Sequence, residues 1–326
     1  MAQASRTNST DLLPRSEPPQ ATTAAFAVIA GLYLFSALNV RIVGPRHWDI
    51  APRLLTRFQT RKVTSRTQAF VRFARALLEH NGDDEALLDL YRQNQIAVHR
   101  RGVFVAAFRR RKGWNPEIVL TGAERLEQAR SKGKGVIIWS DPFVHSAIIG
   151  KRALAQAGFR AWHLSSVGHG ILNSPLADRF INPKVIEVEL RYLAGRVVFD
   201  HQTGGTATRA MMKVLEGNGL ISLTNNAYIG RTIVTPFGRG AVLHVAQTPL
   251  RLAALRSVPL LPLQVIEHDP FRRYEAILGQ DLSEGLRARA GDPVEAAAAA
   301  YANYLFPLAR ANPVQFSGWP MIRLAD

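Results

Sequence analysis

Two patterns of hydrophobic and polar positions divide the chain. From about residue 53 to residue 111 the apolar side chains recur at helical spacing, and the turn signal HNGDD at 80–84 separates two amphipathic helices. From residue 114 onward, short runs rich in β-branched residues alternate with helical runs. This alternation predicts an α/β domain with a mainly parallel or mixed sheet flanked by helices.

The individual elements of this domain follow from the same pattern. The predicted strands are EIVLTG, GVIIWS, FRAWHLSS, RVVFDHQ, LISLTNN, TIVTPFG, LLPLQVIEH and RYEAILG. Between them we predict helices at AERLEQARSKG, at 142–158, at TATRAMMKVLEGNG and at TPLRLAALRSV. The final helix is PVEAAAAAYANYLFPLARA, which contains a run of alanines.

Residues 21–40 form an uncharged run, ATTAAFAVIAGLYLFSALNV. At about 1.5 Å per residue, a helix of this length just spans a bilayer core of about 30 Å, so we predict one transmembrane helix; a buried core helix is the alternative. Between residues 41 and 75 the chain has nine arginine and lysine residues and a single acid, Asp49. The positive-inside rule then places the large domain on the cytoplasmic face of the plasma (inner) membrane.

The predicted organisation has four parts. Residues 1–20, rich in Ser, Thr, Pro and Gln, are expected to be disordered, and residues 21–43 are the transmembrane anchor. Residues 44–112 form a basic helical segment, and residues 113–326 form the α/β domain.

The charge balance and the absence of cysteine narrow the function further. The chain has 41 Lys and Arg against 25 Asp and Glu, a formal charge of +16, which favours an anionic partner such as membrane lipids. Nucleic acid is not expected, because aromatic residues are not interleaved on a basic face. Without cysteine, the chain has no disulfides, no thiolate nucleophile and no Cys-ligated metal.

The segment SDPFVHS, where the second predicted strand meets a helix, is the candidate site. Ligands of open α/β sheets bind beyond the carboxyl ends of strands, and Asp141, His145 and Ser146 fall there. His145 would act as a general base oriented by Asp141. The alternative is structural, because Asp141 followed by Pro142 is also a strong helix start.

The order of several segments resembles the lipid A biosynthesis (lauroyl/myristoyl) acyltransferase family, within the lysophospholipid acyltransferase superfamily. The resemblance covers about residues 115–320. Its segments are GAERLEQARSKGKGVIIWS, HLSSVGHG, a helical pair, LEGNGLISLTNN, VTPFGRG, TPLRLAALRSVPLLPLQVI and NPVQFSGWP.

The family's catalytic pair is altered in this chain. Members typically carry a His and, five positions later, a Glu or Asp just after the strand matched by GVIIWS, but the aligned residues here are Pro142 and Ala147. The resemblance also implies that Phe237, Gly238 and Arg239 in VTPFGRG line the acceptor site. Family members often have a Pro-Asp pair before this segment, and Asn225 stands in its place in this chain.

These observations leave two functions open. The first is an acyltransferase that moves a fatty acyl chain from an acyl carrier protein or coenzyme A thioester to an amphipathic lipid or glycolipid, with no further cofactor. Ser146, Asn225, Phe237, Gly238 and Arg239 would bind substrate. The second is a non-catalytic lipid-binding or scaffold protein that keeps the fold. His163 and His169 in HLSSVGHG are interpreted as loop residues, because no acidic third ligand for a metal is apparent nearby.

Overall fold

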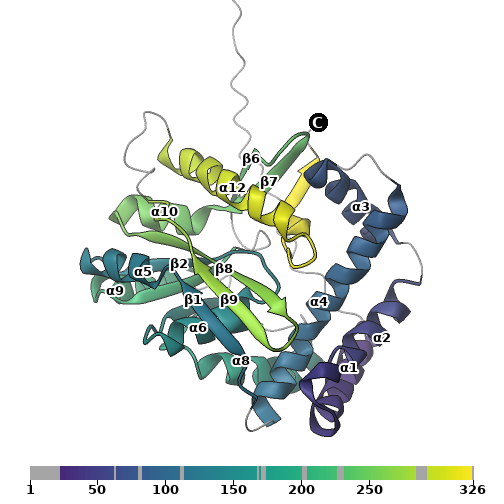
Figure 1. The fold of residues 1–326 in the computed structure, drawn as a ribbon. Coiled ribbons are helices and arrows are strands. Elements are labelled where there is room, and N and C mark those ends of the chain that lie inside the picture. The colour runs from purple at the N-terminus through teal and green to yellow at the C-terminus, as the bar shows by residue number, and fades with distance from the viewer. Residues whose placement is uncertain are drawn as a thin grey trace, which may run out of the picture.

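The computed structural model describes residues 23–61, 64–79, 83–110, 114–166, 169, 174–199, 204–225, 231–283 and 292–324. The predicted α/β architecture, a mixed sheet flanked by helices, is confirmed (Figure 1). The N-terminal segment 1–20, predicted to be disordered, lies outside the described residues, as does most of the predicted turn at 80–84.

A seven-stranded sheet in the order β1-β9-β8-β2-β5-β3-β4 forms the centre of the molecule. β2, β3, β4, β5 and β8 run in one direction, whereas β9 pairs antiparallel with β8 and parallel with β1. The strands are β1 (Glu117–Thr121), β2 (Val136–Ser140), β3 (Trp162–Ser166), β4 (Gly195–Phe199), β5 (Leu220–Thr224), β8 (Leu260–Asp269) and β9 (Arg273–Leu278).

Strand β2 is buried throughout, and its side chains alternate between two hydrophobic cores. Ile137 and Trp139 belong to the core under α3, α9, α10 and α12, while Val136 and Ile138 belong to the core under α1, α4, α5 and α6. A continuous apolar run, rather than an alternating one, is what a strand covered on both faces requires. The end of β2 therefore projects between two packed layers.

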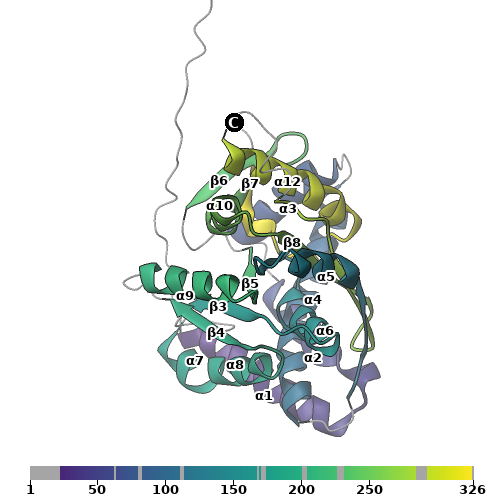
Figure 2. The same cartoon turned by 90° about the vertical axis from the view of Figure 1, so that its left-hand side faces the viewer.

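Helices precede the sheet and cover both of its faces. Figure 2 shows α9 on one side of strands β3 and β4 and α7 and α8 on the other. The helices are α1 (Thr23–Ile42), α2 (Ile50–Gln59), α3 (Ser65–Leu78), α4 (Asp84–Arg110), α5 (Ala123–Ser131), α6 (Lys151–Gln156), α7 (Pro175–Phe180), α8 (Asn182–Leu190), α9 (Gly204–Glu216), α10 (Gln247–Arg256) and α12 (Pro293–Ala311), with single turns η1 (Pro45–His47), η2 (Ser146–Gly150) and η3 (Trp319–Met321).

A second, three-stranded antiparallel sheet has the order β10-β7-β6. It consists of β6 (Thr232–Pro236), β7 (Ala241–Ala246) and β10 (Ile322–Leu324). The sequence pattern predicted β6 but neither β7 nor β10. β7 follows β6 through a short turn and takes part in the core under α12.

The helix predicted over 142–158 is wrong at its start. Residues 141–145 form a loop, a π-helical turn η2 begins at Ser146, and α6 follows from Lys151. Asp141 therefore does not cap a helix, and the capping position is His145, whose side chain makes no capping hydrogen bond. The loop forms because its backbone pairs elsewhere: Val144 donates to the Gln315 carbonyl, and Ser317 donates to the Pro142 carbonyl.

Among the described residues, no helix is long and apolar enough to cross a membrane, so the transmembrane helix predicted over 21–40 is not supported. Helix α1 packs along α4 and buries Tyr33, Ser36, Ala37 and Val40 on the inner side. The alternative prediction, a buried core helix, holds for the inner side only, because Leu34, Phe35, Leu38 and Ile42 of the same helix are exposed.

Candidate functional site

Strands β2 and β5 end side by side, and each is followed at once by a polar residue. Ser140 is in register with Thr224, so Asp141 and Asn225 come next to one another along the carboxyl edge of the sheet. The Asn225 amide donates to the Ser140 carbonyl at 3.0 Å, and the Asp141 amide donates to the Leu263 carbonyl at 2.8 Å. The ends of β2, β5 and β8 are thereby fixed relative to one another.

Two tyrosines of α12 hold the Asp141 carboxylate. The hydroxyl of Tyr301 donates to one oxygen at 2.9 Å, and the hydroxyl of Tyr304 donates to the other at 3.1 Å. Tyr301 in turn accepts a hydrogen bond of 3.0 Å from the Asn225 side chain, and its ring stacks on Trp139 at 4.1 Å between centroids. Because the two tyrosines are three positions apart, they lie on one face of α12.

Burial governs the protonation of Asp141. The residue is 1% exposed, and burial raises the pKa of its carboxyl to about 7, even though the hydrogen bonds from Tyr301 and Tyr304 oppose the rise. Tyr301 is buried, whereas Tyr304 is only partly buried. The group can therefore exchange a proton near neutral pH.

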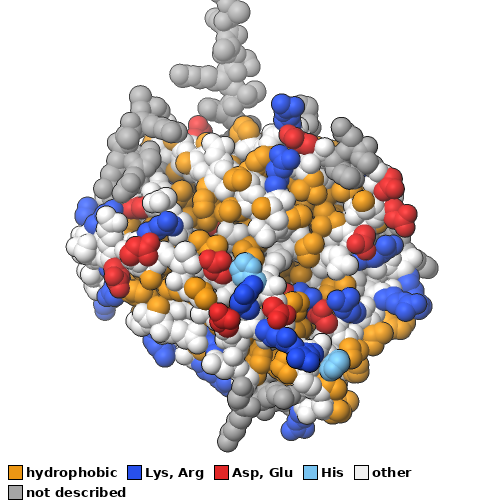
Figure 3. All heavy atoms as spheres, viewed as in Figure 1, with side chains coloured by type: hydrophobic (Ala, Val, Ile, Leu, Met, Phe, Trp, Pro, Cys, Tyr) orange, Lys and Arg blue, Asp and Glu red, His pale blue; other side chains and the backbone are white. Residues whose placement is uncertain are grey.

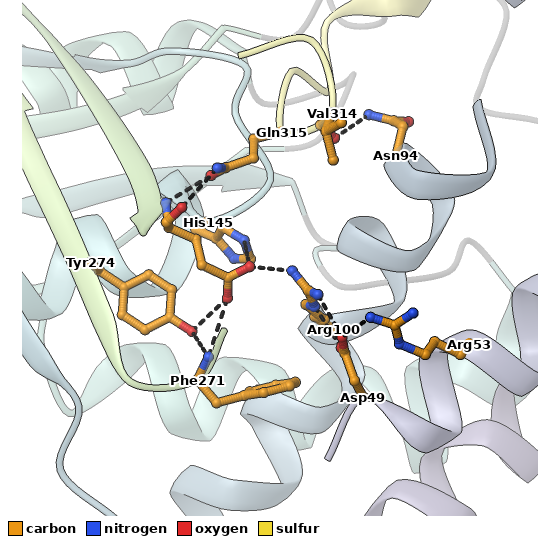
Figure 4. A network of polar contacts seen from close by, with 10 residues as sticks. Asp49, Arg53, Asn94, Arg100, His145, Phe271, Tyr274, Val314 and Gln315 are labelled. Atoms are coloured by element: carbon orange, nitrogen blue, oxygen red, sulfur yellow. Dashed lines mark hydrogen bonds and ion pairs between the residues drawn. The ribbon is translucent and has the colours of Figure 1, made fainter. Parts of the chain in front are cut away.

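A second polar cluster lies on the other side of the loop and surrounds Glu267 of β8 (Figure 4). His145 Nε2 is 3.5 Å from a Glu267 carboxylate oxygen, and the Tyr274 hydroxyl donates to the other oxygen at 2.8 Å. The Phe271 amide donates to the Tyr274 hydroxyl at 2.8 Å. The His145 side chain is fully buried and lies edge-on to Phe104, with 5.2 Å between ring centroids.

Arg100 of α4 joins Glu267 to the N-terminal helices. Its guanidinium forms a close ion pair with Glu267 and binds both carboxylate oxygens of Asp49, at 2.7 and 2.6 Å. Burial alone would raise the pKa of Glu267, but His145 and Arg100 outweigh it and lower the pKa to about 2. Glu267 is therefore a permanently charged residue at neutral pH.

The segment 312–318 closes over the loop between the two clusters. Asn94 of α4 donates to the carbonyls of Val314 and Phe316, both at 2.8 Å. The Gln315 side chain accepts from the Glu267 amide at 2.7 Å and donates to the Glu267 carbonyl at 2.9 Å. Each of these contacts uses backbone groups that strand pairing leaves free.

The structure does not bring the two predicted catalytic residues together as a pair. Asp141 is bound to Tyr301 and Tyr304, whereas the carboxylate beside His145 is that of Glu267. Ser146 is buried, and its hydroxyl has no hydrogen-bond partner within the described part of the chain.

The segment VTPFGRG forms the turn between β6 and β7. Phe237 is buried and packs edge-on against Phe306 of α12, with 5.3 Å between centroids. Gly238 has a φ of +77°, and a β-carbon there would lie 2.3 Å from the Phe306 ring, so any other residue would be strained and would displace Phe306. Arg239 points away, with its side chain 93% exposed and 3.9 Å from Glu79. Phe237 and Gly238 thus position α12.

His163 and His169 do acquire an acidic neighbour, Glu189 of α8. Together they make the one group within the described ranges whose donor atoms could surround a metal ion, all lying within 4.8 Å of one another. The Lys151 ammonium lies 3.0 Å from the Glu189 carboxylate. A cationic group therefore already stands where a metal ion would bind this acid.

Several residues of the two clusters escaped prediction. The pair Tyr301 and Tyr304 interrupts an alanine-rich helix at i, i+3 spacing, and Glu267 is the first acid in a mainly apolar strand; both signals are visible in the sequence. Arg100 gives no comparable signal, because it lies among other basic residues of α4.

Comparison with models of known protein families gives no match, and no curated protein matches the chain.

The buried pair Arg100–Glu267 predicts that replacing Arg100 costs much more stability than replacing Arg53, although both arginines contact Asp49. Arg100→Met should lower the free energy of unfolding by about 3–5 kcal/mol, because Glu267 stays buried without its guanidinium. Arg53→Met, which removes an arginine with a 62% exposed side chain, should cost about 0.5 kcal/mol or less. Urea unfolding measures both, and adding Glu267→Gln to Arg100→Met should recover part of the loss. Equal losses from the two arginine variants would refute this assignment.

The raised pKa of Asp141 predicts an unusual pH dependence. The folded carboxyl holds its proton up to about pH 7 and the unfolded one to about pH 3.9, so this group's contribution to stability falls as the pH rises between these values. Asp141→Asn removes this pH-dependent contribution. The variant should therefore be more stable than wild type at pH 8, by roughly 1–4 kcal/mol, but not at pH 4. Urea unfolding at the two pH values tests this, with the exposed Asp89→Asn as control. Parallel curves for Asp141→Asn and wild type would contradict the raised pKa.

Proposed function

We propose that the protein is an acyltransferase that works at a membrane surface, with Asp141 and Tyr304 as its proton-transfer pair. The observation that carries this proposal is the Asp141 carboxyl, with its pKa near 7, bound by two tyrosines at the carboxyl edge of the sheet. Ligand sites of open α/β sheets lie at this edge. The family resemblance of the surrounding segments supplies the reaction class.

The proposed reaction transfers one proton and one acyl group. The acceptor hydroxyl gives its proton to the Tyr304 oxygen while the Tyr304 proton moves to the Asp141 carboxylate, 3.1 Å away. The acceptor oxygen attacks the carbonyl carbon of an acyl carrier protein or coenzyme A thioester. The carbon–sulfur bond then breaks, and the leaving thiolate takes the proton back along the same route. The products are an ester and a free thiol.

The evidence for a membrane location is the outer face of α1 and α2, which we call the docking face. Its large apolar side chains are exposed, with Ile42 at 70% and Phe58 at 61%. Figure 3 shows hydrophobic and basic side chains side by side over this region at the lower right. The face consists of Leu34, Phe35, Leu38, Ile42, Ile50, Leu54 and Phe58, with the exposed Arg41, Arg46, Arg53, Arg57 and Arg61 around them.

Apolar side chains surrounded by arginines match the interface of an anionic bilayer, where acyl chains lie below phosphate groups. A depression of about 600 Å³ adjoins this face and is lined by Arg46, His47 and Arg272 beside Trp114, which suits an anionic headgroup. The cytoplasmic orientation rests on the arginine asymmetry of the sequence and stays a prediction.

One observation favours the second function, a non-catalytic lipid-binding protein. His145 is fully buried and Asp141 is 1% exposed, whereas Tyr304 is partly buried, so in the proposed reaction the acceptor contacts Tyr304 rather than Asp141 itself. If Tyr304 makes no contact with substrate, the polar clusters stabilise the fold alone. The same docking face would then serve lipid binding without turnover.

A transfer assay separates the two functions. The purified chain is incubated with acyl-coenzyme A or acyl carrier protein thioester and lysophospholipid, and acylated lipid and released thiol are both measured. Activity should rise with pH through about 7, and Asp141→Asn should reduce it about 10²–10⁴-fold. Tyr304→Phe should also reduce it, whereas Asp89→Asn should not. Activity that persists in Asp141→Asn would remove Asp141 from the mechanism, and no wild-type activity with either donor would favour the lipid-binding protein.

Vesicle binding tests the docking face independently of turnover. Leu38→Glu with Ile42→Glu should weaken binding to vesicles rich in anionic phospholipid at least about tenfold, since burying one leucine contributes roughly 1.5–3 kcal/mol. The control is Leu255→Glu on α10, where the leucine is 80% exposed on another element. Binding should also weaken as salt rises. Equal loss in the control, or none in the double variant, would assign membrane binding to another surface.

A further inference from the structure

Asn225 begins a chain of hydrogen bonds that ends at Asp141. The side-chain amide of Asn225 lies 3.0 Å from the Tyr301 hydroxyl, and this hydroxyl lies 2.9 Å from the Oδ1 atom of Asp141. The other carboxyl oxygen, Oδ2, lies 3.1 Å from the Tyr304 hydroxyl. The two oxygens of one acid therefore have different tyrosines as partners, and the tyrosine at Oδ1 is itself bound by Asn225.

Backbone and ring contacts keep this chain in place. The backbone N–H of Asn225 donates to the Ser140 carbonyl at 3.0 Å, and Ser140 directly precedes Asp141. The Tyr301 ring stacks on Trp139 with 4.1 Å between centroids. Asn225 is 3% exposed and Tyr301 is fully buried, so both side chains keep their partners inside the protein.

The ionised state of Asp141 fixes the direction of each hydrogen bond in the chain. A carboxylate can only accept, so the one proton of the Tyr301 hydroxyl points to Oδ1. Burial and the charge of Asp141 raise the pKa of Tyr301 well above its usual value, so the hydroxyl keeps this proton. The Tyr301 oxygen then accepts from Asn225, which requires that the NH₂ group of the amide faces it.

The neutral state offers the proton of Asp141 two positions, and the chain excludes one of them. A proton on Oδ1 would donate to Tyr301, whose own proton would then need Asn225 as its acceptor. For that, the amide of a buried asparagine would have to turn over. A proton on Oδ2 leaves the chain unchanged and donates to Tyr304, which is only partly buried.

We propose that Asn225 is a positioning residue, which acts through Tyr301 to place the proton of neutral Asp141 on Oδ2, the oxygen that faces Tyr304. This role rests on the proposed function, in which Tyr304 exchanges protons with both the acceptor and Asp141. A proton on Oδ1 would face the buried Tyr301 and not the acceptor. Asn225 therefore directs proton exchange to one of two otherwise equivalent oxygens.

Infrared difference spectra of the full chain, recorded without substrate, test the position of the proton. Spectra at about pH 5 and about pH 9 bracket the pKa of Asp141, and loss of a carbonyl band in Asp141→Asn assigns that band. Tyr301→Phe should move the band to higher wavenumber, because the C=O group at Oδ1 loses its donor. Tyr304→Phe should move it less, because the C=O group keeps Tyr301. The reverse order would place the proton on Oδ1 and overturn the proposal.

Carbon-13 NMR of the same carboxyl tests the part played by Asn225. Asn225→Leu should raise the pKa of Asp141, lowering its acid dissociation constant at least about twofold, since the neutral form gains a second position for its proton. The carbonyl band should broaden or split for the same reason. Within the described chain, Arg125 is the other charged group that acts on Tyr304, and it stays charged throughout this range. An unchanged pKa with an unchanged band would refute the role of Asn225.

A matched control removes a buried asparagine elsewhere. Asn182 of α8 is 2% exposed, and its amide donates to Asp178 at 2.7 Å. Asn182→Leu should lower the melting temperature but leave the pKa and the carbonyl band of Asp141 as in wild type. Equal changes in this control would trace the effect to lost stability and overturn the proposal. Where Asn225→Leu does not fold, Asn225→Ala removes the same amide and repeats the test.

Kinetics separate this inference from the proposed function. In the transfer assay Asn225→Leu should lower kcat about 2- to 10-fold, the effect of one net hydrogen bond, with KM unchanged. A raised KM with unchanged kcat would make Asn225 a substrate-binding residue and overturn its positioning role. Absence of wild-type activity would refute the proposed function alone, because the infrared and NMR measurements use no substrate and still decide where the proton lies.

Discussion

Glu267 is a buried carboxylate on the central strand β8, and a buried carboxylate needs a cation beside it. Arg100 supplies this cation. Because Arg100 also binds Asp49, the pair fixes how α4 and the first helices lie against the sheet. The Glu267 carboxylate also accepts a hydrogen bond from the Tyr274 hydroxyl and lies beside His145. These contacts hold the side of the loop after β2 that carries His145.

The loop after β2 is consequently held between two acids in opposite states. Glu267, surrounded by cationic and donor groups, stays ionised, whereas Asp141, bound by two neutral tyrosines, titrates near neutral pH. Only four positions separate Asp141 from His145, yet their side chains belong to different clusters. The environment of each group, and not its identity, decides which can exchange protons.

The sequence predicted the α/β class and all seven strands of the central sheet, because short β-branched runs leave little choice of structure. It also placed Asp141 at the carboxyl end of the second predicted strand, where the structure has it. It could not predict the partners of Asp141 and His145, since Tyr301 and Glu267 are more than 100 positions away and only tertiary packing brings them close. The start of the helix after Asp141 was wrong for a related reason: Gln315 and Ser317 capture the backbone that the local Asp-Pro signal assigned to a helix.

The closing segment around Gln315 has a consequence for the order of synthesis. Asn94 binds the carbonyl of a residue 222 positions later, and the loop after β2 takes its backbone partners from the same late segment. While a ribosome is still making residues 145–310, neither α4 nor this loop has those partners. The strands behind the loop can pair earlier, but the candidate site acquires its shape in the last stage of synthesis, and until then its buried acids are open to water.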